Sequence, residues 1–140
     1  MLVVDASIAV KWFVRETGHE QASTVARAAE RLAAPDRLLL EVANVLRRKT
    51  KQNEISSRQA QLAVEQLSHY VETIIPSAVL LRDAFALAEQ LDHSVYDCAY
   101  LACARHLDAP LLTADQHFAG KARQAGFGSR LQDLNDHPTT

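Results

Sequence analysis

The stretch Met1-Leu2-Val3-Val4-Asp5-Ala6-Ser7 decides the fold of this 140-residue chain. Residues 2–4 are apolar without interruption, which is typical of a strand buried on both faces in the middle of a parallel sheet. Asp5 follows at the carboxyl end of that strand, and ligands bind at this end of open α/β sheets. A simpler interpretation is that Asp5 or Ser7 caps the next helix. This stretch alone favours the cap, so the case for a functional site depends on the rest of the chain.

Composition excludes several classes of protein. The chain is 48% hydrophobic and 23% charged, which is typical of one globular domain over residues 1–140. The net charge of −2 gives no overall basic field, so nucleic-acid binding would need local basic patches or bound cations. The apolar start is too short for a signal peptide and no apolar run reaches membrane-spanning length, so we expect a cytoplasmic protein with no membrane contact.

The cysteines and histidines do not form a recognisable metal or redox motif. Cys98 and Cys103 are five residues apart on a predicted helix and point to different faces, so we expect two reduced core residues. The six histidines lack the paired spacing of a zinc site.

Short apolar runs alternate with helical patterns along the chain. We predict strands at 2–4, 33–36, 71–75, 110–113 and 127–131. We predict helices at 8–14, 16–32, 37–50, 57–69 (capped by Ser56 or Ser57), 77–91, 94–107 and 116–124, and a frayed tail at 132–140. This alternation predicts a parallel sheet with right-handed crossovers.

Four carboxylates fall at ends of elements that share one edge of such a sheet. Helices run antiparallel to the strands, so strand carboxyl ends and helix amino ends lie together. Asp5 and Asp115 end strands, Asp97 is in the first turn of its helix, and Glu41 lies about one turn into its helix. Each acid also has a local explanation; Asp97, for example, fits a capping box that begins at Ser94. One shared site explains these positions better than four independent local roles at one edge of the sheet, so the pattern favours a shared site.

Clustered carboxylates repel one another and raise one another's pKa unless a cation is present. Magnesium and manganese are hard cations that take oxygen ligands. A site of this kind fits phosphodiester hydrolysis, in which metal ions activate water and stabilise the leaving oxygen. Bound metal also attracts phosphate, which would reconcile a net charge of −2 with a nucleic-acid substrate.

Four segments carry a resemblance to a known family: VVDAS (3–7), LLLEVANVLRR (38–48), SVYDCAYLACA (94–104) and LLTAD (111–115). In this order and spacing, the chain resembles PIN-domain ribonucleases, specifically the VapC toxins of toxin–antitoxin pairs. The resemblance covers nearly the whole chain. It implies a three-layer α/β/α fold with a central, mainly parallel sheet of about five short strands.

The resemblance also implies roles for individual residues. Ligands of Mg²⁺ or Mn²⁺ are implied at Asp5, Glu41, Asp97 and Asp115. Ser7 and Thr113 match the small hydroxyl residues that accompany these acids, and we expect them to hydrogen-bond carboxylates. Asn44 matches a recurrent position that orients the site. Cys98 stands where alanine is common and has no expected chemical role.

The implied activity is that of a metal-dependent endoribonuclease that blocks translation. The implied substrate is RNA, with tRNA and rRNA as candidate classes. The implied partners are a VapB-type antitoxin, whose carboxyl-terminal segment would lie near the site, and a second copy of the chain in a homodimer. DNA would be reached only through the antitoxin. Candidate contacts to unpaired RNA are Trp12, Arg15, Arg47, Arg48 and Lys49, each of which is also explained by packing or by solvated charge.

Two other functions remain open from the sequence. One is a phosphotransfer enzyme or receiver-like domain that uses Asp5. A dehalogenase-like phosphatase needs a second aspartate at the position of Ser7. A receiver domain needs adjacent acids near the first strand and a lysine after the last strands, and neither pattern is present. A non-catalytic interaction module with the PIN fold would be expected to have lost one or more of the four acids, and all four are present.

Overall fold

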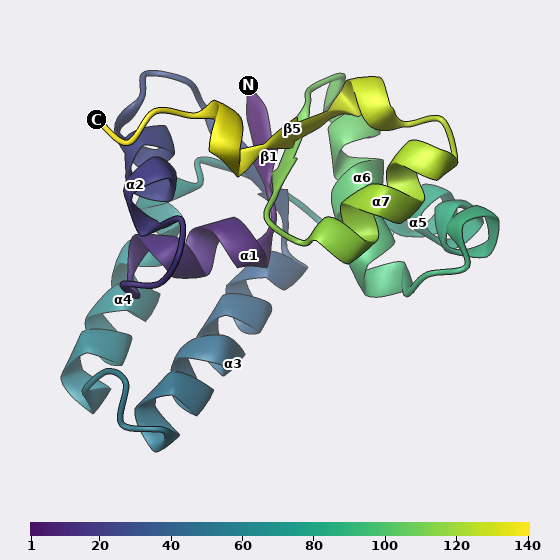
Figure 1. Cartoon of the computed structure of the whole chain (residues 1–140). Helices are drawn as coiled ribbons and strands as arrows, with labels where there is room; N and C mark the ends of the chain where they lie inside the picture. Colours follow the sequence, from purple (N-terminus) through teal and green to yellow (C-terminus); the bar gives the residue numbers. More distant parts are fainter.

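The computed structural model describes all 140 residues and contains one five-stranded sheet (Figure 1). The strands are β1 (Leu2–Val4), β2 (Leu32–Pro35), β3 (Thr73–Ile75), β4 (Leu111–Thr113) and β5 (Leu131–Asp133). Their order is β3-β2-β1-β4-β5 and every pairing is parallel. The opening strand is therefore central and fully buried, as its apolar run predicts.

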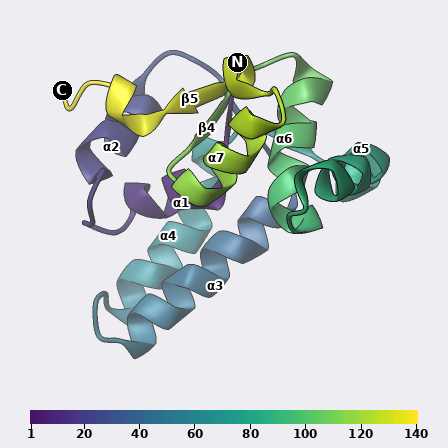
Figure 2. The ribbon, with the colours of Figure 1, turned by 45° about the vertical axis from the view of Figure 1, so that its right-hand side comes forward.

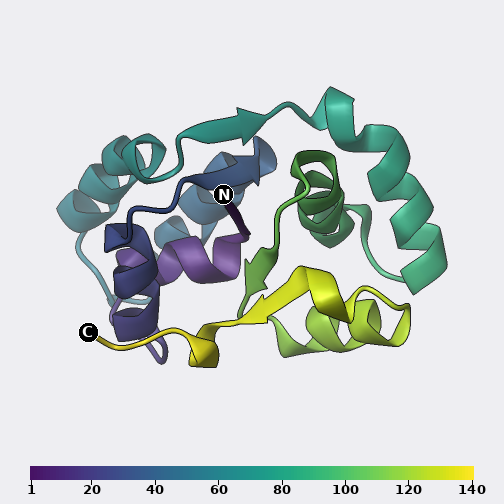
Figure 3. The same cartoon turned by 90° about the horizontal axis from the view of Figure 1, so that it is seen from above.

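Helices lie on both sides of this sheet. They are α1 (Ala6–Ala9), α2 (His19–Arg27), α3 (Arg37–Lys51), α4 (Ser57–Tyr70), α5 (Ser77–Leu91), α6 (Val95–Leu107) and α7 (Gln116–Gln124). Seen from above, α1 to α4 lie on one side of the sheet and α5 to α7 on the other (Figure 3). The predicted three-layer α/β/α fold is confirmed.

Helices α3 and α4 form an antiparallel pair that projects beyond the carboxyl edge of the sheet (Figure 2). Helix α3 begins directly after β2, so its first turn lies at that edge and its later turns lie progressively farther from the sheet. Ser56 caps α4 in a complete capping box with Gln59, which stabilises the start of the returning helix.

Helix α6 has more buried residues than any other helix and packs against β1, β2 and β4. Its small residues allow this close approach. Cys98 and Cys103 are free and fully buried, as expected, and burial raises the pKa of their thiols to about 11 and about 12. Both thiols are therefore protonated core groups. No helix of the chain has the length and apolar character needed to cross a membrane.

The three largest differences in predicted boundaries concern two helices and the last strand. The helix predicted at 16–32 is shorter, because Gly18 takes a left-handed φ of 88° before α2 and Leu32 pairs with Leu2 in the sheet. The first helix starts earlier than predicted and ends in a 3₁₀ turn, Val10–Trp12. The strand predicted at 127–131 instead begins at Leu131, after a 3₁₀ turn at Gly128–Arg130.

The predicted frayed tail is also wrong for residues 132–136. Gln132 and Asp133 pair with Leu112 and Thr113, and Leu134 is buried in a final 3₁₀ turn. This pairing covers the β4 edge, which would otherwise present unpaired backbone groups to solvent. The need to pair the β4 edge arises only in the folded chain, so the polar sequence of the tail does not predict this strand.

Candidate active site

The four predicted acids all lie at the carboxyl edge of the sheet. Asp5 and Asp115 follow β1 and β4, which are neighbours in the sheet. Glu41 is in the second turn of α3 and Asp97 is in the first turn of α6. Helix amino ends and strand carboxyl ends therefore meet here, as the alternation of elements predicts.

Asp5 is the buried member of the group, with 8% of its surface exposed. Its Oδ1 accepts hydrogen bonds from the Ser7 hydroxyl at 2.5 Å and from the Ile8 amide at 3.3 Å, and its Oδ2 accepts one from the Thr113 hydroxyl. The bond from Ile8 shows that Asp5 does cap α1, so the simpler interpretation of this residue is also correct. Burial raises the pKa of Asp5 to about 6, against the lowering effect of the donated hydrogen bonds.

Ser7 and Thr113 join the ends of the two central strands. Each hydroxyl donates to Asp5 and accepts from a backbone amide after β4. Ser7 Oγ accepts from Ala114 N at 3.0 Å, and Thr113 Oγ1 accepts from Asp115 N at 3.0 Å. The predicted hydrogen bonds from these hydroxyls to a carboxylate are confirmed, and they fix Asp5 relative to the chain that leads to Asp115.

Glu41 is held by residues from two helices. Tyr100 of α6 is buried, and its hydroxyl donates to Glu41 Oε1 at 3.0 Å. Arg37 Nε lies 3.3 Å from the same oxygen but lacks the geometry of a hydrogen bond, and the Arg37 guanidinium lies 3.7 Å over the ring of Tyr96. Both partners approach Oε1, so Oε2 has no hydrogen-bond partner within the chain. Glu41 also contributes to the raised pKa of Asp5, which places the two acids within electrostatic reach.

Tyr100 is a residue that the sequence interpretation missed. It follows Asp97 by three residues and therefore lies on the same side of α6, which was a usable signal. Burial, followed by the charges of Glu41 and Asp5, raises the pKa of Tyr100 well above its ordinary value. The hydroxyl therefore remains protonated and can donate to Glu41 throughout the physiological range.

Asp97 and Asp115 take local partners in this structure. Asp97 Oδ2 lies 2.6 Å from His93 Nε2, while the Asp97 amide donates to Ser94 Oγ at 3.3 Å. The predicted capping box is thus only half formed, because the carboxylate pairs with His93 instead of the cap amide. Asp115 Oδ1 accepts from the Phe118 amide at 3.1 Å and caps α7.

The structure does not gather these acids into a preformed metal site. No three histidine, cysteine, aspartate or glutamate side chains of the chain converge on a point that could hold a metal ion. Each of the four carboxylates pairs with a nearby donor of its own. The donor chemistry nevertheless fits a hard cation. Glu41 Oε2, Asp97 Oδ1 and Asp115 Oδ2 are carboxylate oxygens that accept no hydrogen bond within the chain.

Asn44 is exposed on α3, and its side chain makes no hydrogen bond to any of the acids. The structure therefore gives no contact through which Asn44 could orient the site.

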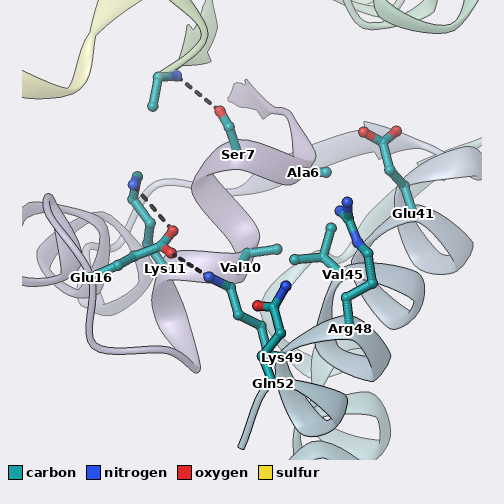
Figure 4. Close-up of a pocket in the computed structure, with 11 residues that line it drawn as sticks. Ala6, Ser7, Val10, Lys11, Glu16, Glu41, Val45, Arg48, Lys49 and Gln52 are labelled. Atoms are coloured by element: carbon teal, nitrogen blue, oxygen red, sulfur yellow. Dashed lines mark hydrogen bonds and ion pairs between the residues drawn. The ribbon is translucent and has the colours of Figure 1, made fainter. Parts of the chain in front are cut away.

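A pocket of about 490 Å³ opens beside Glu41, the one of the four acids that lines it (Figure 4). Ser7 and Glu41 line one part of it, and Arg48 and Lys49 line another. Of the other candidate RNA contacts, Arg15 lies in a separate surface hollow and Arg47 faces α4. Trp12 is wrong as a candidate, because it is 8% exposed, donates to Ala22 O at 3.0 Å and packs on Tyr70.

Replacing Tyr100 by phenylalanine tests whether its hydroxyl positions Glu41. The variant should bind Mn²⁺ about 10-fold more weakly, in line with the loss of an outer-shell partner of a metal ligand. High Mn²⁺ should restore binding, because the ligands themselves remain. The measurement is a Mn²⁺ titration, with the melting temperature as a check on folding. Unchanged Mn²⁺ affinity in a folded variant would show that the hydroxyl is only structural.

Comparison with known proteins agrees with the fold and identifies the family. Residues 2–124 match the PIN domain family. Ribonuclease VapC3 of Pyrobaculum aerophilum is 35% identical over 122 residues, which is 86% of this chain and 93% of that protein. Ribonuclease VapC9 of Mycobacterium tuberculosis is 30% identical over 115 residues, which is 82% of this chain and 86% of that protein.

The crystal structure of Mycobacterium tuberculosis VapC20, described as a toxin that cleaves the sarcin-ricin loop, has the same fold. It superimposes with a TM-score of 0.66 at 20% identity, covering 91% of this chain and 96% of that one. The family match, the extent of the sequence identity and the shared fold lead to one conclusion: the chain belongs to the PIN-domain family and, within it, to the VapC-type ribonuclease toxins.

Proposed function

We propose that this protein is a Mg²⁺- or Mn²⁺-dependent endoribonuclease, the toxin of a toxin–antitoxin pair, which hydrolyses RNA phosphodiester bonds at Asp5, Glu41, Asp97 and Asp115. One observation carries the proposal. Asp5 is a buried carboxyl whose pKa is raised to about 6, Glu41 adds to that rise, and Glu41 lines a pocket that also carries basic side chains. Such an electrostatic cost is relieved when a cation binds.

Each residue has a distinct part in this proposal. Glu41, Asp97 and Asp115 each offer a free carboxylate oxygen, and Asp5 supplies the most deeply buried negative charge. Ser7 and Thr113 hold Asp5 in place, and Tyr100 holds Glu41. A bound divalent cation would supply activation of water and stabilisation of the leaving oxygen.

The remaining partners follow from membership of the VapC group. We propose inhibition by a VapB-type antitoxin, contact with DNA only through that antitoxin, and action on tRNA or rRNA in the cytoplasm. We also propose a homodimer. Its support is a set of exposed apolar side chains from three neighbouring helices: Leu40, Val79, Leu81, Phe85 and Tyr96. Light scattering of the isolated chain tests this part, and a monomer at all concentrations would contradict it.

The test of the activity is incubation of the purified protein, free of antitoxin, with total RNA. Cleavage is expected in Mg²⁺ and in Mn²⁺ and is expected to stop in EDTA. Sequencing the new RNA ends would then identify the cleaved RNA. Cleavage that continues in EDTA, or its absence with every RNA and metal tested from folded protein, would contradict the proposal.

A phosphotransfer role for Asp5 is less well supported. A dehalogenase-like enzyme needs a second aspartate at the position of Ser7, and Ser7 instead donates a hydrogen bond to Asp5. Stable labelling of Asp5 by beryllofluoride would reverse this judgement.

A further inference from the structure

The pocket that Glu41 lines carries basic side chains in the part that lies away from Glu41. Three cations line it, namely Lys11, Arg48 and Lys49, together with one further carboxylate, Glu16 (Figure 4). A pocket with acids in one part and cations in another suits a chain of phosphates bound partly through metal ions and partly through direct contacts. Which of the three cations is available for such a contact depends on their partners within the chain.

The two lysines are already neutralised. Lys11 Nζ lies 3.2 Å from Glu16 Oε1 and donates to the Thr17 carbonyl at 2.6 Å. Lys49 Nζ lies 3.6 Å from Glu16 Oε2 and 2.9 Å from Glu54 Oε2, and hydrogen bonding to Glu54 raises the pKa of Lys49. These ion pairs connect the 3₁₀ turn after α1 to the last turn of α3 and shape the pocket wall.

Arg48 differs from both lysines. It is exposed, and its guanidinium makes no hydrogen bond or ion pair within the chain. Figure 4 shows the guanidinium reaching along α3 in the direction of Glu41. Its charge is therefore the unpaired one on this wall of the pocket.

Helix geometry explains why Arg48 shares a wall with Glu41 and Arg47 does not. Arg48 follows Glu41 by seven residues, which is two turns, so the two side chains lie on the same side of α3 about 10 Å apart along the axis. Arg47 is rotated by about 100° from Arg48 and lines a different hollow, between α3 and α4.

We propose that Arg48 binds a non-scissile phosphate of a single-stranded RNA whose scissile phosphate lies at the four acids. This inference rests on the proposed function. A guanidinium can donate two parallel hydrogen bonds to one phosphate, and it stays charged at any physiological pH. The contact fixes the position of the strand without reading its sequence.

The test compares Arg48→Gln with Arg47→Gln, the same change at the adjacent position of the same helix. A fluorescein-labelled oligouridylate is titrated with each protein in EDTA, so that binding is measured without cleavage. Arg48→Gln should bind about 10-fold more weakly, as expected for loss of a hydrogen bond to a charged group. The slope of log affinity against log salt should also fall by about 0.7, the value for one phosphate of a single strand. Arg47→Gln should match the wild-type protein, and Arg48→Lys should recover part of the loss.

A second measurement separates this contact from the nuclease activity. In Mg²⁺, Arg48→Gln should raise KM for RNA with little change in kcat, because a non-scissile contact binds substrate and transition state equally. If Arg48→Gln binds RNA as tightly as the wild-type protein, or if the two glutamine variants lose affinity equally, the phosphate contact is wrong. If the wild-type protein binds no RNA in EDTA, an unchanged KM for Arg48→Gln in Mg²⁺ overturns the contact. If the protein binds RNA through Arg48 but never cleaves it, the proposed phosphate contact stands and the proposed nuclease activity is wrong.

Discussion

Asp97→Asn is expected to lower RNA cleavage in Mg²⁺ by more than about 100-fold, beyond the 10- to 100-fold range for loss of an outer-shell partner. The amide removes one negative charge from the group of acids, and with it a proposed metal ligand. The fold should survive, because the side chain is 35% exposed and its remaining oxygen can still accept from His93, which lies 2.6 Å away. The measurement is the cleavage rate of the RNA identified from total RNA.

Asp83→Asn is the matched control for this substitution. Asp83 lies on α5, is 40% exposed and makes a surface ion pair with Arg105 at 3.3 Å. It undergoes the same chemical change away from the acids, and surface ion pairs contribute little to stability. Asp83→Asn should therefore cleave at the wild-type rate. Equal activity of Asp97→Asn and Asp83→Asn, with both proteins folded, would show that Asp97 has no part in catalysis.

Asp5 should make the stability of the metal-free protein depend on pH. Its pKa is 3.8 in its ordinary state and about 6 in the folded protein, raised mainly by burial. Below about pH 3 the carboxyl is protonated in both states, so its ionisation does not affect the free energy of unfolding. As the pH rises, the unfolded chain ionises first, and stability is lost until the folded carboxyl also ionises above about pH 6. The loss should reach about 3 kcal/mol, at 1.36 kcal/mol for each pKa unit.

Asp5→Asn should remove this loss. Urea denaturation of both proteins in EDTA, between about pH 3 and pH 7.5, gives the free energy of unfolding at each pH. The difference between variant and wild type should shift by about 3 kcal/mol in favour of the variant as the pH rises. Mg²⁺ or Mn²⁺ at pH 7 should stabilise the wild type more than the variant, since only a bound ligand shifts the equilibrium. Parallel stability curves in EDTA would contradict the burial of an ionisable carboxyl here.

The sequence predicts the centre of this fold better than its edges. The strand Leu2–Val4 and the helix Gln116–Gln124 are predicted without error, because continuous burial and helical periodicity leave a direct pattern. The last strand, Leu131–Asp133, is half exposed at the edge of the sheet, and its sequence carries no such pattern. This strand forms because it pairs with the free edge of β4, and that edge exists only in the folded chain.

The candidate site shows the same division. The position of the acids at one edge follows from the order of the elements. The expectation that Ser7 and Thr113 bond to a carboxylate comes from the family resemblance, since Thr113 is 108 positions from Asp5. The partners of the other acids could not be predicted in the same way. Tyr100 meets Glu41 across 59 positions of sequence, and the choice of Asp97 between its cap amide and His93 depends on side-chain placement. The four acids share one edge of the sheet, but each pairs with a donor of its own there.

The central claim is that Asp5, Glu41, Asp97 and Asp115 together bind a divalent cation, although they are not gathered into a metal site in this structure. The most direct measurement is the binding of Mn²⁺, followed by electron paramagnetic resonance, to the wild-type protein and to Asp5→Asn, Glu41→Gln, Asp97→Asn and Asp115→Asn. The account predicts saturable binding by the wild-type protein and weaker binding by each of the four variants, with Asp83→Asn unchanged. A wild-type protein that binds no Mn²⁺ at millimolar concentration, or four variants that bind it as well as the wild type, would contradict the account.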